Sequence, residues 1–144
     1  EIAPRWRDDP RLPATLATLG LARGELDAVE RQLRNGAEST GLMAEQYFLT
    51  LLWKGDAARA GSFAEAMMAH GSAQDQAWWR ERLGDSAFLT GNTQRARDYY
   101  EMSLDGHARP SSVWLKLSDV YFKLGDLEKE RTYRERVYGA LRGR

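Results

Sequence analysis

The sequence predicts an all-α fold built as a stack of antiparallel helix pairs. Apolar residues recur at helical spacing, and no segment shows the sustained two-residue alternation of a half-buried strand. A glycine followed by a polar residue also recurs along the chain, at spacings of 31, 36 and 34 residues. These pairs are Gly24-Glu25, Gly55-Asp56, Gly91-Asn92 and Gly125-Asp126. We expect each of them to form the tight turn between two helices.

The segment around Gly125 illustrates the local pattern. Leu117, Tyr121 and Leu124 precede the glycine at spacings that place them on one face of a helix. Glycine adopts the backbone conformation that commonly ends a helix, and Asp126 can cap the next one. Similar periodic stretches follow the other turns, as in Leu26, Val29 and Leu33, or Ala96, Tyr99, Tyr100 and Ser103. The pattern predicts helix, turn and helix four times over.

The predicted organisation is a lead segment followed by four units. The lead covers residues 1–9, and the units cover residues 10–40, 41–76, 77–110 and 111–144. The last two units align without gaps at an offset of 34 residues. The identical pairs are Leu83/Leu117, Asp85/Asp119, Phe88/Phe122, Gly91/Gly125, Arg97/Arg131, Tyr99/Tyr133 and Glu101/Glu135. Most of these lie at apolar or turn positions, which favours a true repeat.

A unit of about 34 residues made of two antiparallel helices resembles the tetratricopeptide repeat. The residues that match its pattern are Leu83, Gly84, Gly91, Ala96, Tyr100 and Ser103 in the third unit and Trp114, Leu117, Tyr121, Gly125 and Val137 in the fourth. Pro110 lies just before the fourth unit, as in that family. The second unit keeps Tyr47, Gly55, Ala60 and Met67, and the first keeps Leu16, Ala17 and Gly24. The resemblance implies an α-solenoid that coils as a right-handed superhelix.

The fourth unit departs from that pattern at Ser118, which stands at the small position of the first helix, and at two positions of the second helix. Glu130 and Arg134 stand where the family has alanine and an aromatic residue, and they can pair across one helical turn. The last unit of a repeat array needs a polar outer face, which this pair would supply. Alternatively, the charged face could dock a following domain.

Composition excludes several functional classes. The 21 Lys and Arg residues balance the 21 Asp and Glu residues, so no overall positive field attracts nucleic acid. The absence of cysteine excludes disulfides and thiolate metal sites. No segment is long and apolar enough to predict membrane insertion. The chain starts with EIAPRWRDDP, without Met or a signal-peptide core, so we expect an excised or processed fragment. The sequence leaves three settings open for it: the cytoplasm, the periplasm, or the soluble domain of a membrane-tethered protein.

No catalytic or cofactor motif stands out. His70 and His107 lie near the predicted ends of second helices, where a histidine favours the helix dipole, and neither has a partner at metal-site spacing. The glycines form neither a dinucleotide nor a phosphate-loop motif, and no nucleophile-elbow motif occurs. We therefore expect a protein that is not an enzyme and carries no metal or cofactor.

The resemblance implies which residues face the concave groove of the solenoid. They are Glu45, Leu49, Leu52 and Trp53 in the second unit, Trp78, Glu81, Asp85, Phe88 and Leu89 in the third, and Leu115, Asp119, Phe122 and Lys123 in the fourth. The first unit would contribute the small or apolar residues Ala14, Thr18, Leu21 and Ala22.

Large aromatic residues and acids dominate this predicted groove. The aromatics Trp53, Trp78, Phe88 and Phe122 suit anchoring of a helix or an extended peptide. Because Lys123 is the exception among otherwise acidic charges, we expect a ligand with basic residues and disfavour a clamp for a carboxylate. Alternatively, the aromatics cover one another, or residues 1–9 fill the groove.

The sequence thus predicts a non-catalytic scaffold that binds a protein or peptide partner. Modules of this kind recur in bacterial envelope, secretion and polysaccharide-export assemblies. The alternative is a regulatory or self-association domain, attached to an output domain, that forms homo-oligomers through its exposed end helices.

Overall fold

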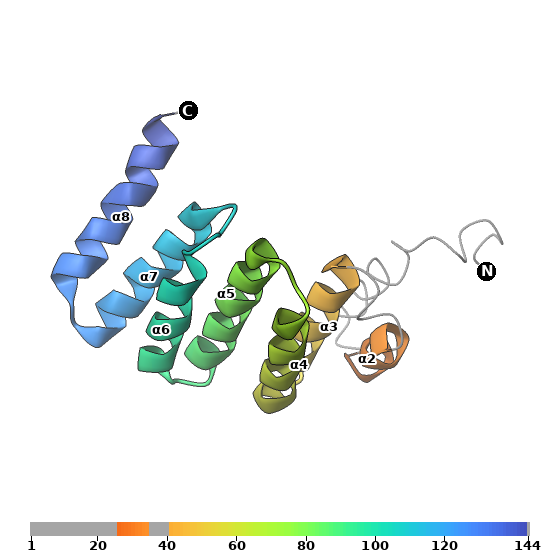
Figure 1. The fold of residues 1–144 in the computed structure, drawn as a ribbon. Coiled ribbons are helices and arrows are strands. Elements are labelled where there is room, and N and C mark those ends of the chain that lie inside the picture. Colours follow the sequence, from red (N-terminus) through yellow and green to blue (C-terminus); the bar gives the residue numbers. More distant parts are fainter. Residues whose placement is uncertain (1–25, 35–40, 144) are drawn as a thin grey trace. The chain divides into compact units, whose positions relative to one another are not determined.

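The computed structural model describes residues 26–34 and 41–143, and within them every regular element is a helix (Figure 1). The helices are α2 (Leu26–Arg34), α3 (Gly41–Trp53), α4 (Ala57–Ala69), α5 (Ala73–Leu89), α6 (Thr93–Ser103), α7 (Pro110–Leu124) and α8 (Leu127–Arg142). The predicted all-α class is confirmed. The chain divides into two compact units, residues 1–60 and 61–144. The lead segment, the Gly24-Glu25 turn and the groove positions of the first predicted unit lie outside the described residues.

Three predicted turns share one hydrogen-bond pattern. Gly55, Gly91 and Gly125 have φ angles of 81°, 83° and 80°, in the left-handed region that favours glycine. In the last turn, the Gly125 amide donates to the Phe122 carbonyl at 3.1 Å and the Asp126 amide to the Tyr121 carbonyl at 3.0 Å. The same two bonds occur at the equivalent positions of the other turns. This is the Schellman motif, which satisfies the last carbonyls of a helix.

The polar residue after each glycine caps the next helix. The side chains of Asp56, Asn92 and Asp126 each accept a hydrogen bond from the backbone N–H three residues later, at 3.1–3.2 Å. Two further helix starts use other devices. Ser72 and Asp75 form a reciprocal capping box before α5, and Pro110 occupies the first turn of α7. Pro110, which lies just before the fourth predicted unit, is the first residue of α7.

Consecutive helices of the second unit pack against one another: α5 against α6, α6 against α7, and α7 against α8. Their shared core contains Ala87, Ala96, Tyr100, Val113, Leu117, Val120, Tyr121 and Tyr133. Gly84 allows a close approach between helices, since a β-carbon there would lie 2.5 Å from the Tyr100 ring. Leu117 is fully buried, which contributes about 2 kcal/mol to stability by burial alone.

A polar network joins the last three helices. Glu101 of α6 accepts hydrogen bonds from the Tyr121 hydroxyl of α7 at 2.7 Å and from the Tyr133 hydroxyl of α8 at 2.8 Å. The two tyrosine rings stack with centroids 5.8 Å apart. Burial, followed by the bond to Glu101, raises the pKa of Tyr133 to about 12 and also raises that of Tyr121. Both phenols therefore stay protonated donors at neutral pH.

The first unit contains a buried carboxylate. The side chain of Glu30 on α2 is only 4 % exposed and receives bonds from Lys54, from Arg59 at 2.6 Å and from Arg34 at 3.0 Å. Hydrogen bonds from Lys54 and then Arg59 lower the pKa of Glu30 to about 2. Glu30 thus ties α2 to the end of α3 and the start of α4, beside the buried Leu33.

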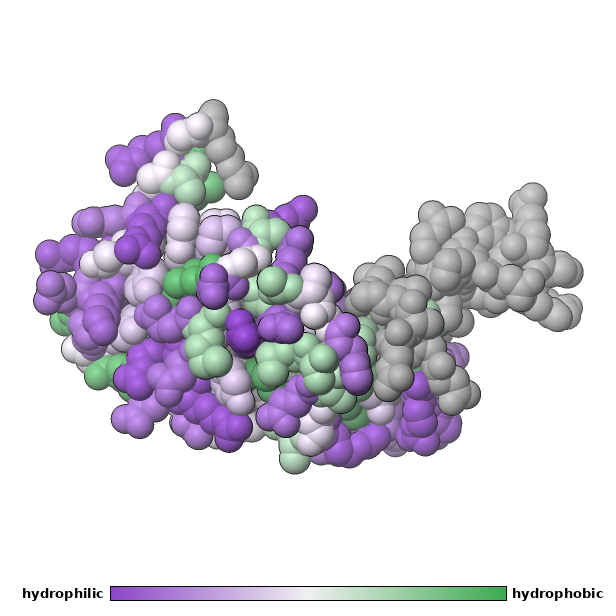
Figure 2. All heavy atoms as spheres, viewed as in Figure 1, coloured by the Kyte–Doolittle hydropathy of each residue, from purple (hydrophilic) through white to green (hydrophobic). Residues whose placement is uncertain are grey.

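The surface of the described residues is mixed in character. On the face in Figure 2, hydrophobic residues occur as separate patches among hydrophilic ones. On α8, Arg134 Nη1 lies 3.4 Å from Glu130 Oε1, so the predicted pairing across one helical turn is confirmed. Within the described ranges, no helix combines the length and apolar character that a membrane span requires.

Candidate functional site

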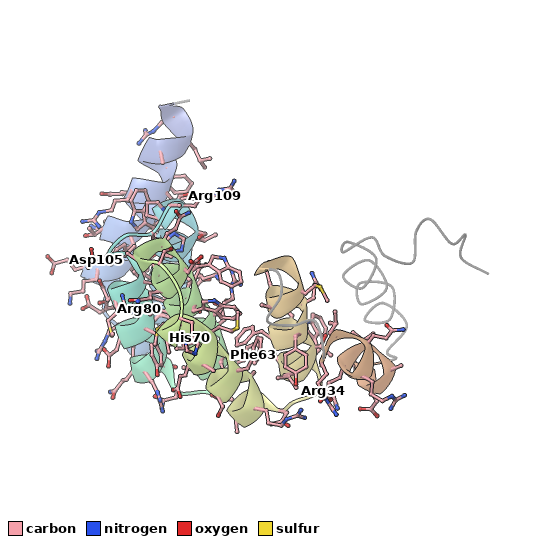
Figure 3. The ribbon with its side chains drawn as sticks, turned by 45° about the vertical axis from the view of Figure 1, so that its right-hand side comes forward. Arg34, Phe63, His70, Arg80, Asp105 and Arg109 are labelled. Atoms are coloured by element: carbon pink, nitrogen blue, oxygen red, sulfur yellow. The ribbon has the colours of Figure 1, made fainter. Side chains whose placement is uncertain are left out.

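An open cavity of about 620 Å³ lies between α5 and α7. Its lining comprises Gln74, Asp75, Trp78, Glu81 and Arg82 of α5, His107, Ala108 and Arg109 of the α6–α7 connection, and Ser111, Ser112 and Lys116 of α7. Figure 3 labels Arg109, which lies in that connection just before α7. The cavity has the size of many ligand sites and combines one large aromatic wall with several charges.

Glu81 is the best-bonded polar residue of this cavity. Its side chain is 2 % exposed and accepts bonds from Lys116 Nζ at 2.6 Å, His107 Nε2 at 2.7 Å and Ser112 Oγ at 3.3 Å. Burial opposes its ionisation, but the hydrogen bond and charge of Lys116 prevail and lower the pKa of Glu81. Glu81 is therefore an ionised acceptor that holds α5, α7 and their connection together.

His107 has a different role from the one predicted. The sequence placed it at a helix end for its effect on the dipole, but α6 ends at Ser103 and the ring of His107 contacts Glu81. The backbone N–H of Arg109 donates to His107 Nδ1 at 2.9 Å. Because Nδ1 accepts, the neutral ring carries its proton on Nε2 and donates it to Glu81. The dipole interpretation of His107 is therefore wrong.

The negative charge of Asp85 is likewise paired with basic side chains. Its carboxylate lies 2.9 Å from Lys116 Nζ and 3.0 Å from an Arg82 nitrogen, and the Tyr100 hydroxyl donates to it at 2.7 Å. Burial, with the nearby Asp85 charge, raises the pKa of Tyr100. The sequence predicted that Glu81 and Asp85 give the groove free acidic charge. The structure corrects this, because both carboxylates are already paired with bases from α5 and α7.

The two aromatic residues predicted on α5 differ in their surroundings. Trp78 is half-buried in the cavity wall, edge-on to Trp79 with ring centroids 4.6 Å apart, and the Arg82 guanidinium lies 4.9 Å from its ring. Phe88 packs against the core of the second unit, with Lys123 Nζ 4.7 Å from its ring. For Phe88 the packing favours a role in the core.

The other predicted groove residues lie elsewhere. Among the groove residues of the second predicted repeat, Trp53 is 71 % exposed while Glu45, Leu49 and Leu52 are half-buried. In the second unit, Leu89 is exposed, and Leu115, Asp119 and Phe122 line a separate groove between α7 and α8. The structure therefore divides the predicted set into several surfaces, with only Trp78 and Glu81 in the α5–α7 lining.

Sequence reasoning missed the basic half of the cavity. Arg82 and Lys116 follow Glu81 and Leu115 directly and lie 34 residues apart, so they share one register position of the repeat. That equivalence was a signal available in the sequence. His107 and Arg109 come from the connection into α7, where no periodic pattern predicts the direction of a side chain.

Comparisons with known proteins bear on the fold. No protein-family model matches the chain. A search of curated proteins finds no match either. Nine chains of solved structures resemble it, among them BtubC (BKLC) from P. vanneervenii, with a TM-score of 0.69 and 20 % sequence identity. That match covers 96 % of this chain and 68 % of BtubC. At this level of identity the likeness shows a shared fold and carries no function.

Proposed function

We propose that this chain is a non-catalytic protein-binding scaffold, an α-solenoid of tetratricopeptide-like units, whose α5–α7 cavity binds a short segment of a partner protein. The repeated Schellman turns at Gly55, Gly91 and Gly125 support the repeat. Consecutive helices that pack together across such tight turns support antiparallel pairs. The chain would then be a subunit of a multi-protein assembly. Modules of this kind recur in bacterial envelope, secretion and polysaccharide-export systems.

The single observation that carries the proposal is the composition of the α5–α7 cavity. Trp78 offers an aromatic surface, and large aromatics in concave sites are frequent anchors of binding energy. Ser111 and Ser112 add hydroxyl groups at the start of α7. Both ring nitrogens of His107 are engaged within the chain, by Glu81 and by the Arg109 backbone N–H.

The charges in the cavity define the chemistry of the segment. Glu81 is already paired, and Asp75 closes the capping box of α5. Arg109 is exposed and makes no ion pair with any residue that the structure describes. A partner segment with an apolar side chain against Trp78 and an acidic group near Arg109 would fit this cavity best. This replaces the basic ligand that the sequence favoured, because the acids on which that expectation rested are neutralised.

A peptide-library selection on the full chain tests the proposal. Selected peptides should combine an acidic residue with an apolar one, and Trp78→Ala should lose them, since truncation of an aromatic anchor weakens binding by about tenfold or more. Arg109→Glu should shift the selection towards basic peptides without loss of fold, because that side chain is exposed. Leu89→Ala, exposed and outside the cavity, is the matched control. Selection of the same peptides by all three variants would refute the site.

A further inference from the structure

A second groove, of about 330 Å³, lies between α7 and α8. Its lining comprises Leu115, Ser118, Asp119, Phe122, Glu130, Arg134, Val137 and Tyr138. Phe122 is 67 % exposed and Tyr138 is 55 % exposed, so the groove presents a substantial apolar surface to solvent. Large exposed apolar side chains that gather on one face commonly mark an interaction site.

The repeat shows what normally covers such a groove. Subtracting 34 from each lining residue gives Glu81, Gly84, Asp85, Phe88, Ala96, Tyr100, Ser103 and Leu104. All eight are buried or half-buried on α5, α6 and the turn that follows them. Val113 and Leu117 of α7 share a core with Ala96 and Tyr100. The same position of the repeat is therefore covered by α7 in the earlier repeat and open in the last one, with Asp119 and Phe122 identical to their counterparts Asp85 and Phe88.

The open groove keeps one of the two α5 carboxylates that bind Lys116 of α7, whereas the other, Glu81, is replaced by Leu115. Asp119 is the equivalent of Asp85, which binds Lys116 of α7. Asp119 is exposed and has no ion-pair partner in the described part of the chain. Glu135 is likewise the equivalent of Glu101 and is exposed.

The equivalence of Glu135 with Glu101 adds a second polar requirement. Glu101 accepts the Tyr121 hydroxyl of α7 at 2.7 Å. A helix placed like α7 would thus meet one carboxylate for a basic residue and one for a hydroxyl donor.

Six of the eight lining positions differ in residue type from their covered counterparts, and two of these differences introduce an ion pair. Glu130 and Arg134 replace Ala96 and Tyr100, and their ion pair lies in the lining. The Arg134 side chain is 47 % exposed and can turn aside, whereas Glu130 is 13 % exposed. A ligand helix would therefore carry polar or small residues opposite this pair, with its apolar residues over Phe122, Val137 and Tyr138.

We propose that the α7–α8 groove binds an amphipathic helix of another protein, patterned like α7. Such a helix carries an apolar stripe, a basic residue that pairs with Asp119 and a hydroxyl donor directed at Glu135. A second folded copy of this chain does not supply it, since its own α7 is already buried against α5 and α6. This goes beyond the scaffold function proposed above, because the groove, its residues and the helical ligand are distinct from the α5–α7 cavity.

An amide NMR titration of the full chain with a capped peptide of the α7 sequence, PSSVWLKLSDVYFKL, tests this proposal. Binding should shift the amides of the α7–α8 groove and leave those of the α5–α7 cavity unchanged. Phe122→Ala should weaken binding about tenfold, as truncation of a central aromatic contact does. Leu127→Ala is the matched control, because that leucine is 57 % exposed and lies outside the groove lining.

A charge exchange makes the test specific. Asp119→Lys should weaken binding of the original peptide, and a peptide with glutamate in place of its first lysine should restore it. Absence of groove shifts at the highest soluble peptide concentration would overturn the proposal. Sedimentation of the chain alone as a dimer that Phe122→Ala dissociates would also overturn it, in favour of a second copy as the occupant.

Discussion

Glu30 and Glu81 are both buried glutamates, yet they solve the problem of a buried charge differently. Glu30 of the first unit receives bonds from three side chains with full positive charges, Lys54, Arg59 and Arg34. Glu81 of the second unit receives bonds from one lysine, one histidine and one serine. Burying a carboxylate is costly unless it is paired and hydrogen-bonded, and both arrangements meet that requirement.

The difference concerns what else each carboxylate can do. Glu30 is saturated by cations, so its main effect is on the stability of the first unit. Glu81 lines an open cavity and shares Lys116 with Asp85, so its charge also determines what that cavity attracts.

Glu30→Gln should lower the free energy of unfolding by about 2 kcal/mol, less than the loss of one partner of a fully buried ion pair. The reduction is partial because Arg34 and Arg59 are substantially exposed and regain hydration. Urea denaturation followed by circular dichroism measures it. Asp27→Asn is the matched control, since Asp27 contacts Lys54 at 2.8 Å but is 77 % exposed, and it should leave the free energy of unfolding nearly unchanged.

The same variant should change the acid limb of the stability curve. The pKa of Glu30 is depressed to about 2 in the folded state, below its ordinary value of 4.5. Its contribution is therefore complete above about pH 4.5 and is lost as the pH falls towards about 2. Glu30→Gln should flatten this limb, and an acid limb as steep as that of the wild type would contradict the assignment.

Glu81→Gln should cost less stability, about 1 kcal/mol, because the amide oxygen still accepts one bond and Lys116 keeps Asp85. Its effect on binding should be larger than that of Glu30→Gln. Loss of the negative charge should strengthen binding of an acidic peptide to the α5–α7 cavity. If Glu30→Gln changed peptide affinity as much as Glu81→Gln did, the two roles would not be separate.

A third carboxylate, Glu101, extends the comparison to uncharged donors. Tyr133→Phe removes a hydroxyl that bonds both Glu101 oxygens, at 2.8 and 2.9 Å, and should cost about 1 kcal/mol. The folded pKa of Tyr133 is raised to about 12, so its contribution is present below about pH 10 and is lost as the pH rises through 12. Denaturation at several alkaline pH values checks this, with the exposed Tyr138→Phe as control.

Local signals predicted the turns but could not predict these carboxylates. A tight turn at a Gly-Asp or Gly-Asn pair requires only a positive φ at the glycine and a nearby polar cap. The sequence alone therefore indicated the three turns that the structure describes, together with their register. Glu130 and Arg134 are one turn apart, and their pairing was equally predictable. The prediction that Glu81 and Asp85 are free acidic charges was wrong, because both form ion pairs with Lys116. That lysine lies more than 30 residues further along the chain, so no local pattern indicated the pairing.

Glu30 shows the same limit. It lies beside Val29 on a helix whose apolar periodicity was recognised, yet periodicity treats a glutamate as a solvent-facing residue. Of its cations, only Arg34 is local, while Lys54 and Arg59 come from 24 and 29 residues further along the chain. Single-sequence patterns carry no information on which distant charges meet, so a buried ion cluster emerges only from the packed helices.

The most direct test of the scaffold account is an amide NMR titration of the full chain with an acidic, apolar peptide selected from a library. The account predicts shifts at the Trp78 indole and at the Arg109 and Ser112 amides, with affinity reduced about tenfold in Arg109→Glu. Shifts centred outside the α5–α7 cavity, with equal affinity for Arg109→Glu and the wild type, would contradict it.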